Sequence, residues 1–307
     1  MTYDLIIIGG GPAGVSAGVY AARKKLKTLL IAPEFGGQSI VSEGIENWIG
    51  TIKISGGDLA KDLKNHLLAY AGDSVEVKEG EYVKDIKKDS DSFIVTSDSG
   101  EYSGKTILIA TGSTRRKLEV PGADIYDNKG LTYCASCDGP LFSGQDVVVI
   151  GGGNAAFETS AQLLAYCKSV TLLNRSEKFK ADEITVNKLK ENSHFKIITN
   201  AIPKEIKGDK FVSSIVYEDS NTNEIHEIQT PAVFVEIGLI PTTDFAKNII
   251  NLNQIGQIPV NPRNQQTEVQ GIWAAGDCTD GLYHQNNIAS GDAVKALEDI
   301  YVTLRTK

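Results

Sequence analysis

The chain has 307 residues, of which 41% are hydrophobic and 23% are charged. This length allows one large domain or two of ordinary size, and the hydrophobic fraction is sufficient for a buried core. The formal net charge of -8 argues against a nucleic-acid surface, which needs a basic patch, and no apolar run is long enough to span a bilayer. Because Met1 leads directly into a strand pattern, we expect a cytoplasmic protein with no nucleic-acid or membrane partner.

Four cysteines are too few for a disulfide scaffold in a chain of this length. Cys134 and Cys137 form a C-x-x-C pair, whereas Cys167 and Cys278 stand apart. A zinc site would need further ligands at close spacing, and the four histidines are scattered along the chain. We therefore predict no metal site, and the close cysteine pair is the candidate for redox chemistry.

The 30 glycines exceed the usual share of a globular chain, and the first of them begin a nucleotide-binding pattern. Residues 4–31 are typical of a strand, a helix and a second strand, with Gly9, Gly11 and Gly14 as G-x-G-x-x-G after the first strand. In this setting the glycines make a tight turn, allow backbone N–H groups to approach a pyrophosphate, and let helix and strand pack closely. The pattern predicts a dinucleotide at the start of the helix, with Glu34 or main-chain groups at the ribose.

The same unit occurs a second time. Residues 146–173 repeat it, with Gly151 and Gly153 followed by Ala156. Both copies keep the glycines that close approach of a ligand requires, so we predict two dinucleotide sites rather than a duplicated scaffold without ligands. The strands predicted from the two units are residues 4–8, 27–31, 146–150 and 170–173.

Three further hydrophobic segments end in small residues. Residues 106–112 and 272–277 each end as a strand does when the chain passes beneath a bound cofactor, and the second segment supplies a carboxylate. Residues 233–241 look like the counterpart of the first segment in the second unit. Each segment alone would also be typical of an ordinary strand end.

These motifs together resemble the low-molecular-weight thioredoxin reductases and the flavoprotein part of the alkyl hydroperoxide reductases. The resemblance covers essentially the whole chain, and it implies FAD at the first site, NADPH or NADH at the second, and a redox disulfide just before the second unit. It rests on GGGPAG at 9–14, FGGQ at 35–38, IENWIG at 45–50, ATG at 110–112, YCASCDG at 133–139, GGGNAAFE at 151–158 and AAGDC at 274–278.

The resemblance also implies the domain organisation. We expect an α/β fold with two Rossmann-like nucleotide-binding domains of the three-layer type. A discontinuous FAD-binding domain would comprise residues 1–113 plus 245–307, and an inserted NAD(P)H-binding domain, residues 114–244, would carry the C-x-x-C pair. The larger glutathione reductase group differs, because its cysteines follow the first βαβ unit, whereas residues 36–45 here contain none.

The resemblance assigns roles to individual residues. Cys137 would be the thiol nearest the flavin, Cys134 the thiol that attacks an external disulfide, and Asp138 the proton donor and acceptor. From the residues alone, Asp138 is equally typical of a turn before Gly139. The residues expected at FAD are Gly9, Gly11, Pro12, Ala13, Gly14, Glu34, Gly37, Gln38, Asn47, Thr111, Gly112, Asp277, Gln285 and Asn286. The family usually has apolar residues after the last glutamine, whereas Asn286 and Asn287 are polar.

The coenzyme site gives two conflicting indications. NADPH-dependent thioredoxin reductases have a His-Arg-Arg run and a later Arg for the 2′-phosphate, whereas this chain has Asn174, Arg175 and Ser176, then Lys180. The remaining positive charges favour NADPH, but segments such as 178–183 resemble the NADH-using alkyl hydroperoxide reductase flavoproteins. The residues expected at this site are Gly151, Gly153, Asn154, Ala155, Ala156, Asn174, Arg175 and Lys180.

The resemblance therefore implies an FAD-dependent thioredoxin-disulfide reductase, a homodimer with NADPH slightly favoured over NADH. Electrons would pass from NAD(P)H to FAD, then to Cys134 and Cys137, and then to thioredoxin or a thioredoxin-like small protein. Two alternatives stay open: an NADH-dependent reductase that serves a peroxiredoxin system, and a thioredoxin reductase that takes electrons from ferredoxin. A flavin-bound redox sensor without turnover is a third, disfavoured by the complete cysteine motif.

Overall fold

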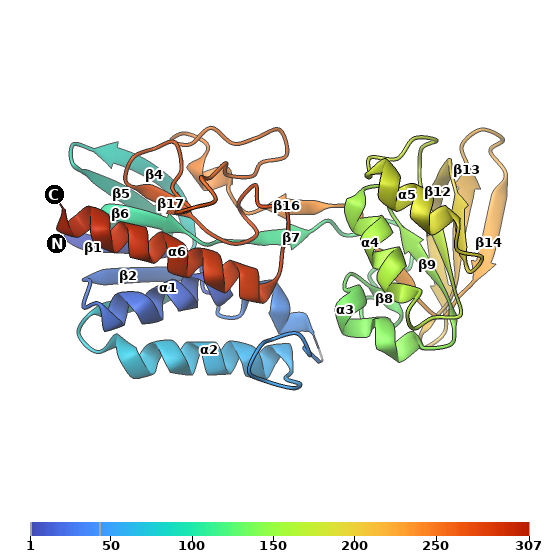
Figure 1. Ribbon diagram of the computed structural model, residues 1–307, viewed down its shortest axis with the longest axis horizontal. Helices are drawn as coiled ribbons and strands as arrows, with labels where there is room; N and C mark the ends of the chain where they lie inside the picture. Colours follow the sequence, from blue (N-terminus) through green and yellow to red (C-terminus); the bar gives the residue numbers. More distant parts are fainter. Residues whose placement is uncertain (1, 43, 307) are drawn as a thin grey trace. The chain divides into compact units, whose positions relative to one another are not determined.

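The computed structural model describes residues 2–42 and 44–306. The chain divides into two compact units, which we call the outer unit (residues 1–114 and 240–307) and the inserted unit (residues 115–239). Two connecting segments, β7 (Ser113–Arg115) and β16 (Leu239–Pro241), pair with each other as a two-stranded ribbon (Figure 1). The inserted unit is therefore entered and left through adjacent strands.

A seven-stranded sheet forms the centre of the outer unit. Its order is β3-β2-β1-β6-β5-β4, and β17 pairs in parallel with the carboxyl half of β6, at Ile107 to Ile109. Strands β1, β2, β3 and β6 run parallel, whereas β4 and β5 are antiparallel to their neighbours. The strands are β1 (Thr2–Ile8), β2 (Thr28–Ala32), β3 (Val75–Glu79), β4 (Val83–Asp89), β5 (Ser92–Ser97), β6 (Glu101–Ile109) and β17 (Ile272–Ala274).

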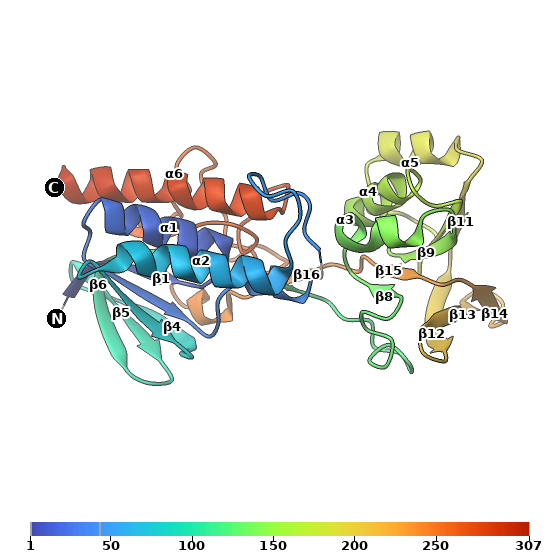
Figure 2. The ribbon, with the colours of Figure 1, turned by 90° about the horizontal axis from the view of Figure 1, so that it is seen from below.

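Alternate residues of this sheet enter two different cores. Leu5 and Ile7 of β1 face the core that contains the helices, whereas Ile6 and Ile8 face a second core with Phe93 of β5. Figure 2 shows the three long helices together on one face of the sheet. The helical elements are α1 (Pro12–Arg23), η1 (Gly37–Val41), α2 (Gly56–Ala71), η3 (Asp244–Ala246) and α6 (Asn286–Arg305).

The inserted unit has the same layered plan. A parallel sheet of order β11-β10-β9-β15-β8 places Val147 and Val149 against helices α4 and α5, and Val148 and Ile150 against an antiparallel sheet of order β12-β13-β14. The strands are β8 (Leu131–Thr132), β9 (Asp146–Ile150), β10 (Ser169–Leu173), β11 (Phe195–Ile198), β12 (Ala201–Gly208), β13 (Val212–Asp219), β14 (Ile225–Gln229) and β15 (Val233–Val235). The helical elements are α3 (Ala135–Asp138), η2 (Gly139–Phe142), α4 (Asn154–Leu163) and α5 (Glu183–Lys190).

The predicted fold class is confirmed, because each unit contains a Rossmann-like sheet. The four strands predicted from the two βαβ units are β1, β2, β9 and β10, within two residues at each end. The segment 233–241 agrees with its expected likeness to the first unit: β15 and β16 flank Gly238 at φ +109°, just as β6 and β7 flank Gly112 at φ +63°. The backbone there takes a left-handed conformation that ends a strand.

The second crossing between the units lies at residues 239 and 240, five residues before the expected boundary. Residues 240–244 belong with the outer unit because the Thr242 amide donates to the Gly112 carbonyl over 3.0 Å and Thr111 Oγ1 donates to the Thr242 carbonyl over 2.7 Å. The nucleotide assigned to each domain stays a prediction. Among the described residues, none of the helices is long and apolar enough to span a bilayer.

Leu67 tests how α2 is held on the sheet. It is fully buried on α2, and its Cδ1 would lie 2.7 Å from a Cβ atom built on Gly18 of α1, so the two helices meet at this point. We expect Leu67→Ala to lower the free energy of unfolding by about 2–5 kcal/mol, through lost burial and a cavity. The neighbouring Leu68 is 48% exposed, so Leu68→Ala is the matched control and should change stability by less than about 0.5 kcal/mol. Equal effects in urea unfolding would contradict the predicted packing.

Candidate functional site

The first glycine turn brings backbone atoms into unusually close approach. Gly9 has φ +122°, and a Cβ atom built on Gly14 would lie only 1.9 Å from the Gly9 carbonyl oxygen. Pro12 begins α1, Gly11 offers no side-chain cap, and the first turn contains no acidic residue. The backbone N–H groups at the start of α1 are therefore positioned to donate hydrogen bonds to a phosphate.

A cavity of about 320 Å³ lies next to this turn, entirely within the outer unit. A Cβ atom built on Gly11 would meet only Gly37 Cα, at 3.9 Å, so backbone borders the space without obstruction. This glycine-lined cradle fits a dinucleotide such as FAD. The expected FAD residues in its lining are Gly9, Gly11, Pro12, Ala13, Glu34, Gly37, Gln38, Thr111, Gly112, Asp277 and Asn286.

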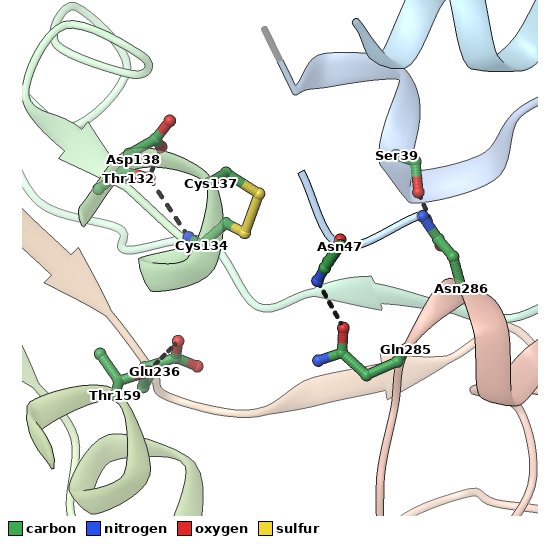
Figure 3. Close-up of a disulfide and its surroundings, with 10 residues drawn as sticks. All are labelled: Ser39, Asn47, Thr132, Cys134, Cys137, Asp138, Thr159, Glu236, Gln285 and Asn286. Atoms are coloured by element: carbon green, nitrogen blue, oxygen red, sulfur yellow. Dashed lines mark hydrogen bonds between the residues drawn. A yellow bond between two sulfur atoms is a disulfide. The ribbon is translucent and has the colours of Figure 1, made fainter. Parts of the chain in front are cut away.

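The remaining expected FAD residues do not appear in this lining. Gly14 allows the close backbone contact with Gly9 in the turn. Asn47 Nδ2 donates a hydrogen bond to Gln285 Oε1 over 3.0 Å. Ser39 Oγ donates to Asn286 Oδ1 over 2.8 Å (Figure 3). Asn287 Nδ2 donates to the Asn47 carbonyl over 2.7 Å. We call Ser39, Asn47, Gln285, Asn286 and Asn287 the polar clasp, because their hydrogen bonds connect Ser39 and Asn47 to the start of α6.

One ionisable neighbour of the cradle has no sequence signature. His284 Nδ1 lies 3.4 Å from Asp277 Oδ1, and this hydrogen bond is the main reason that the pKa of His284 is raised. Asp277 is one of the residues expected at FAD. The imidazole therefore fixes the side chain of Asp277 at the edge of the cradle.

The cysteine pair lies in the inserted unit, around the short helix α3. Cys134 and Cys137 form a disulfide with Cα atoms 5.3 Å apart, and both are partly exposed. Cys167 and Cys278 are buried, and burial raises the pKa of both thiols, to about 11 for Cys278. The chain thus separates one accessible pair from two thiols that stay protonated at neutral pH.

Asp138 is held by a residue that sequence reasoning missed. Thr132 Oγ1 donates to Asp138 Oδ2 and also accepts from the Cys134 amide at 3.3 Å (Figure 3). Thr132 ends β8 and is only 4% exposed, so this hydroxyl has a fixed position. Its location two residues before the first cysteine was the only available signal. The Thr132 hydroxyl therefore connects the Asp138 carboxylate to the backbone of Cys134.

The second glycine turn joins β9 to α4. A Cβ atom built on Gly151 would lie 2.7 Å from Ala156 Cβ, and Gly153 precedes α4 without a side-chain cap. Asn154 Oδ1 accepts from the Asp182 amide at 2.8 Å, so this side chain holds a neighbouring loop. Ala155 lies exposed on the first turn of α4.

The residues after β10 have unequal roles. Asn174 is buried, and its Nδ2 donates to the carbonyls of Ser176 at 2.6 Å and Lys178 at 3.1 Å. Its amide group therefore braces the loop. Arg175 and Lys180 are exposed, and the Lys180 amide donates to the Gly152 carbonyl over 2.7 Å. Lys178 is exposed as well, so this loop carries three exposed cations.

Comparison with solved structures gives matches over the whole chain. Thioredoxin reductase from Streptococcus pyogenes is 33% identical, with a TM-score of 0.88 over 100% of this chain and 99% of that one. Thioredoxin reductase from Giardia duodenalis is 31% identical, with a TM-score of 0.90 over 99% of both chains.

The curated relatives have other names and are longer. An NADH dehydrogenase of Bacillus subtilis is 38% identical over 96% of this chain, and a subunit of the alkyl hydroperoxide reductase of Staphylococcus aureus is 40% identical over the same share. The chain spans 57% of the length of each of these relatives.

The family described as pyridine nucleotide-disulphide oxidoreductase matches residues 3–293. This range contains both glycine turns and the cysteine pair, and the thioredoxin reductases above share the same fold. The chain therefore belongs to the pyridine nucleotide-disulphide oxidoreductase family.

Proposed function

We propose that the protein is an FAD-dependent NAD(P)H:disulfide oxidoreductase that reduces a small redox protein through Cys134 and Cys137. The observation that carries this proposal is the partly exposed disulfide with Asp138 fixed beside it. When bound, FAD supplies the two-electron relay between a reduced nicotinamide and a disulfide. The outer unit contributes the glycine cradle for it, and the inserted unit contributes the second glycine turn for the coenzyme.

The reduced cysteine pair then acts by thiol–disulfide exchange. The Cys134 thiolate attacks one sulfur of the external disulfide, a mixed disulfide forms, and the other external sulfur leaves as a thiolate. Cys137 then attacks Cys134, which restores the internal disulfide and releases the second external thiol. Two electrons pass to the acceptor, and Asp138 exchanges protons with the sulfur atoms in these steps. Thr132 holds the Asp138 carboxylate during this exchange.

The acceptor that we propose is thioredoxin or a thioredoxin-like small protein. Support comes from the full-length similarity to thioredoxin reductases of two organisms. The second candidate is an NADH-dependent reductase of a peroxiredoxin system, and it is favoured by the names of the curated relatives. The exposed Arg175 and Lys180 instead favour NADPH, because both could bind a 2′-phosphate.

The electron donor can be identified by anaerobic reduction of the FAD-loaded protein. We expect NADPH to bleach the visible absorbance of the flavin faster than NADH, because Arg175 and Lys180 offer positive charge to the 2′-phosphate. Arg175→Ala should reduce the advantage of NADPH and leave the rate with NADH unchanged. Faster bleaching by NADH would favour the second candidate, whereas bleaching by reduced ferredoxin alone would refute the use of a nicotinamide coenzyme.

The two redox cysteines should separate the half-reactions. We expect Cys134→Ser and Cys137→Ser each to abolish steady-state reduction of thioredoxin, while bleaching of the flavin by the coenzyme continues. The reason is that neither variant can close the internal disulfide. Cys167→Ala removes a buried thiol outside this site and is the matched control. Normal turnover in either serine variant would refute the role of the pair.

The polar clasp should slow the release of FAD. Asn287 makes two hydrogen bonds to residues 47–49. Its Nδ2 donates to the Asn47 carbonyl over 2.7 Å, and its Oδ1 accepts from the Ile49 amide at 3.4 Å. Asn287→Ala removes both bonds and should speed FAD release about fivefold or more, because each bond contributes about 0.5–1.5 kcal/mol. The measurement is the rise of flavin fluorescence after dilution of the loaded protein.

A matched control for the clasp is Asn65→Ala, on the exposed surface of α2. Its release rate should equal that of the wild type. An unchanged rate in Asn287→Ala would show that the clasp does not retain the cofactor.

A further inference from the structure

Glu236 lies directly beside the second glycine turn. It follows β15 in the inserted unit, and its amide donates to the Ile150 carbonyl over 2.8 Å. A Cβ atom built on Gly151 would lie 2.4 Å from the Glu236 carbonyl oxygen. The main chain of residue 236 therefore forms one wall of the turn.

The carboxyl group of Glu236 is held in a partly buried position. Thr159 Oγ1, on α4, donates to Glu236 Oε1 over 2.9 Å (Figure 3). Burial is the main cause that raises the pKa of Glu236, with a smaller contribution from Glu158, whereas Arg115 and the Thr159 hydrogen bond act in the opposite direction. Burial of a carboxyl group is unfavourable, so a perturbed carboxyl beside a ligand-binding turn is a candidate for function.

The strand order decides which part of a coenzyme would meet this carboxyl. The sheet has the order β11-β10-β9-β15-β8, and its parallel strands place their carboxyl ends at one edge. In such sheets a dinucleotide lies across the edge where the strand order reverses, with its pyrophosphate at the glycine turn. Here β9 leads to the turn, β10 lies on one side and β15 on the other.

The two neighbours of β9 therefore serve different halves of the coenzyme. Arg175 and Lys180, which follow β10, lie on the side of the adenosine half. Glu236 follows β15 and lies on the opposite side, where the nicotinamide half extends. On the adenosine side such folds use a carboxylate to accept hydrogen bonds from ribose hydroxyls, and Glu236 offers the same acceptor group on the opposite side.

We infer that Glu236 binds the hydroxyl groups of the nicotinamide-side ribose and positions that half of the coenzyme. This inference rests on the proposed function, because it assumes that the second glycine turn binds NADPH or NADH. Thr159 is a positioning residue for the carboxyl, since its hydroxyl acts on the coenzyme through Glu236. Glu236 should contribute equally to both coenzymes, whereas Arg175 discriminates between them.

Calorimetric titration of the oxidised, FAD-loaded protein tests the inference without turnover. The ligands are NADP⁺, NAD⁺, ADP-ribose, which has the second ribose without nicotinamide, and ADP, which has neither. Glu236→Ala should weaken binding of the first three by about tenfold or more and leave ADP unchanged. Glu236→Gln has nearly the same shape and keeps one acceptor, so it should bind these ligands with intermediate affinity.

Arg175→Ala is the matched control from the opposite side of the turn. This variant should bind NADP⁺ with lower affinity than the wild type and bind the other three ligands with unchanged affinity. If Glu236→Ala and Glu236→Gln lower the affinity for ADP as much as the affinity for NAD⁺, Glu236 only supports the structure of the turn and the inference is wrong.

Two further outcomes would also overturn the inference. Loss of affinity for NAD⁺ without loss for ADP-ribose would show that Glu236 contacts the nicotinamide ring and not the ribose. Unchanged affinity for all ligands would show that Glu236 does not contact the coenzyme. If the wild type binds none of the four ligands, the proposed coenzyme use fails together with this inference.

Discussion

Close approach of backbone to backbone at two glycine turns is the constraint on which both sites depend. A Cβ atom on Gly14 would lie 1.9 Å from the Gly9 carbonyl oxygen, and one on Gly151 would lie 2.4 Å from the Glu236 carbonyl oxygen. Because no side chain intervenes, α1 and α4 begin directly at the carboxyl edge of their sheets. The same absence of side chains leaves room for phosphate groups next to the amides at the helix starts.

Hydrogen bonds between polar side chains hold the other parts of both sites in place, over long range in the outer unit and over short range in the inserted unit. In the outer unit, Ser39 and Asn47 reach the start of α6, almost at the other end of the chain. In the inserted unit, Thr132 connects the Asp138 carboxylate to the Cys134 amide within a few residues. The glycine-lined cradle therefore depends on long-range folding, whereas the position of the Asp138 carboxylate depends on one short segment.

The parts that could be predicted from sequence are those with a local pattern. Both βαβ units, their glycine turns and the C-x-x-C pair follow from spacing within about 30 residues. Long-range partners have no such pattern, so the Thr159–Glu236 bond and the polar clasp were not predicted. Asn174 is a local exception, because its Nδ2 donates to the Ser176 and Lys178 carbonyls within four residues and this was not predicted. Its place at the coenzyme stays a prediction.

The interleaved order of the two units has a consequence for synthesis on the ribosome. Strand β6 pairs through its carboxyl half with β17, and α6 covers the same sheet, yet both follow the whole inserted unit in the chain. Residues 115–239 are contiguous and possess their own two cores, so they can fold as soon as they emerge. Residues 2–42 and 44–114 must wait, with the flank of β6 uncovered, until the last quarter of the chain is made. Until β17 is made, the carboxyl half of β6 therefore keeps one hydrophobic edge without its partner strand.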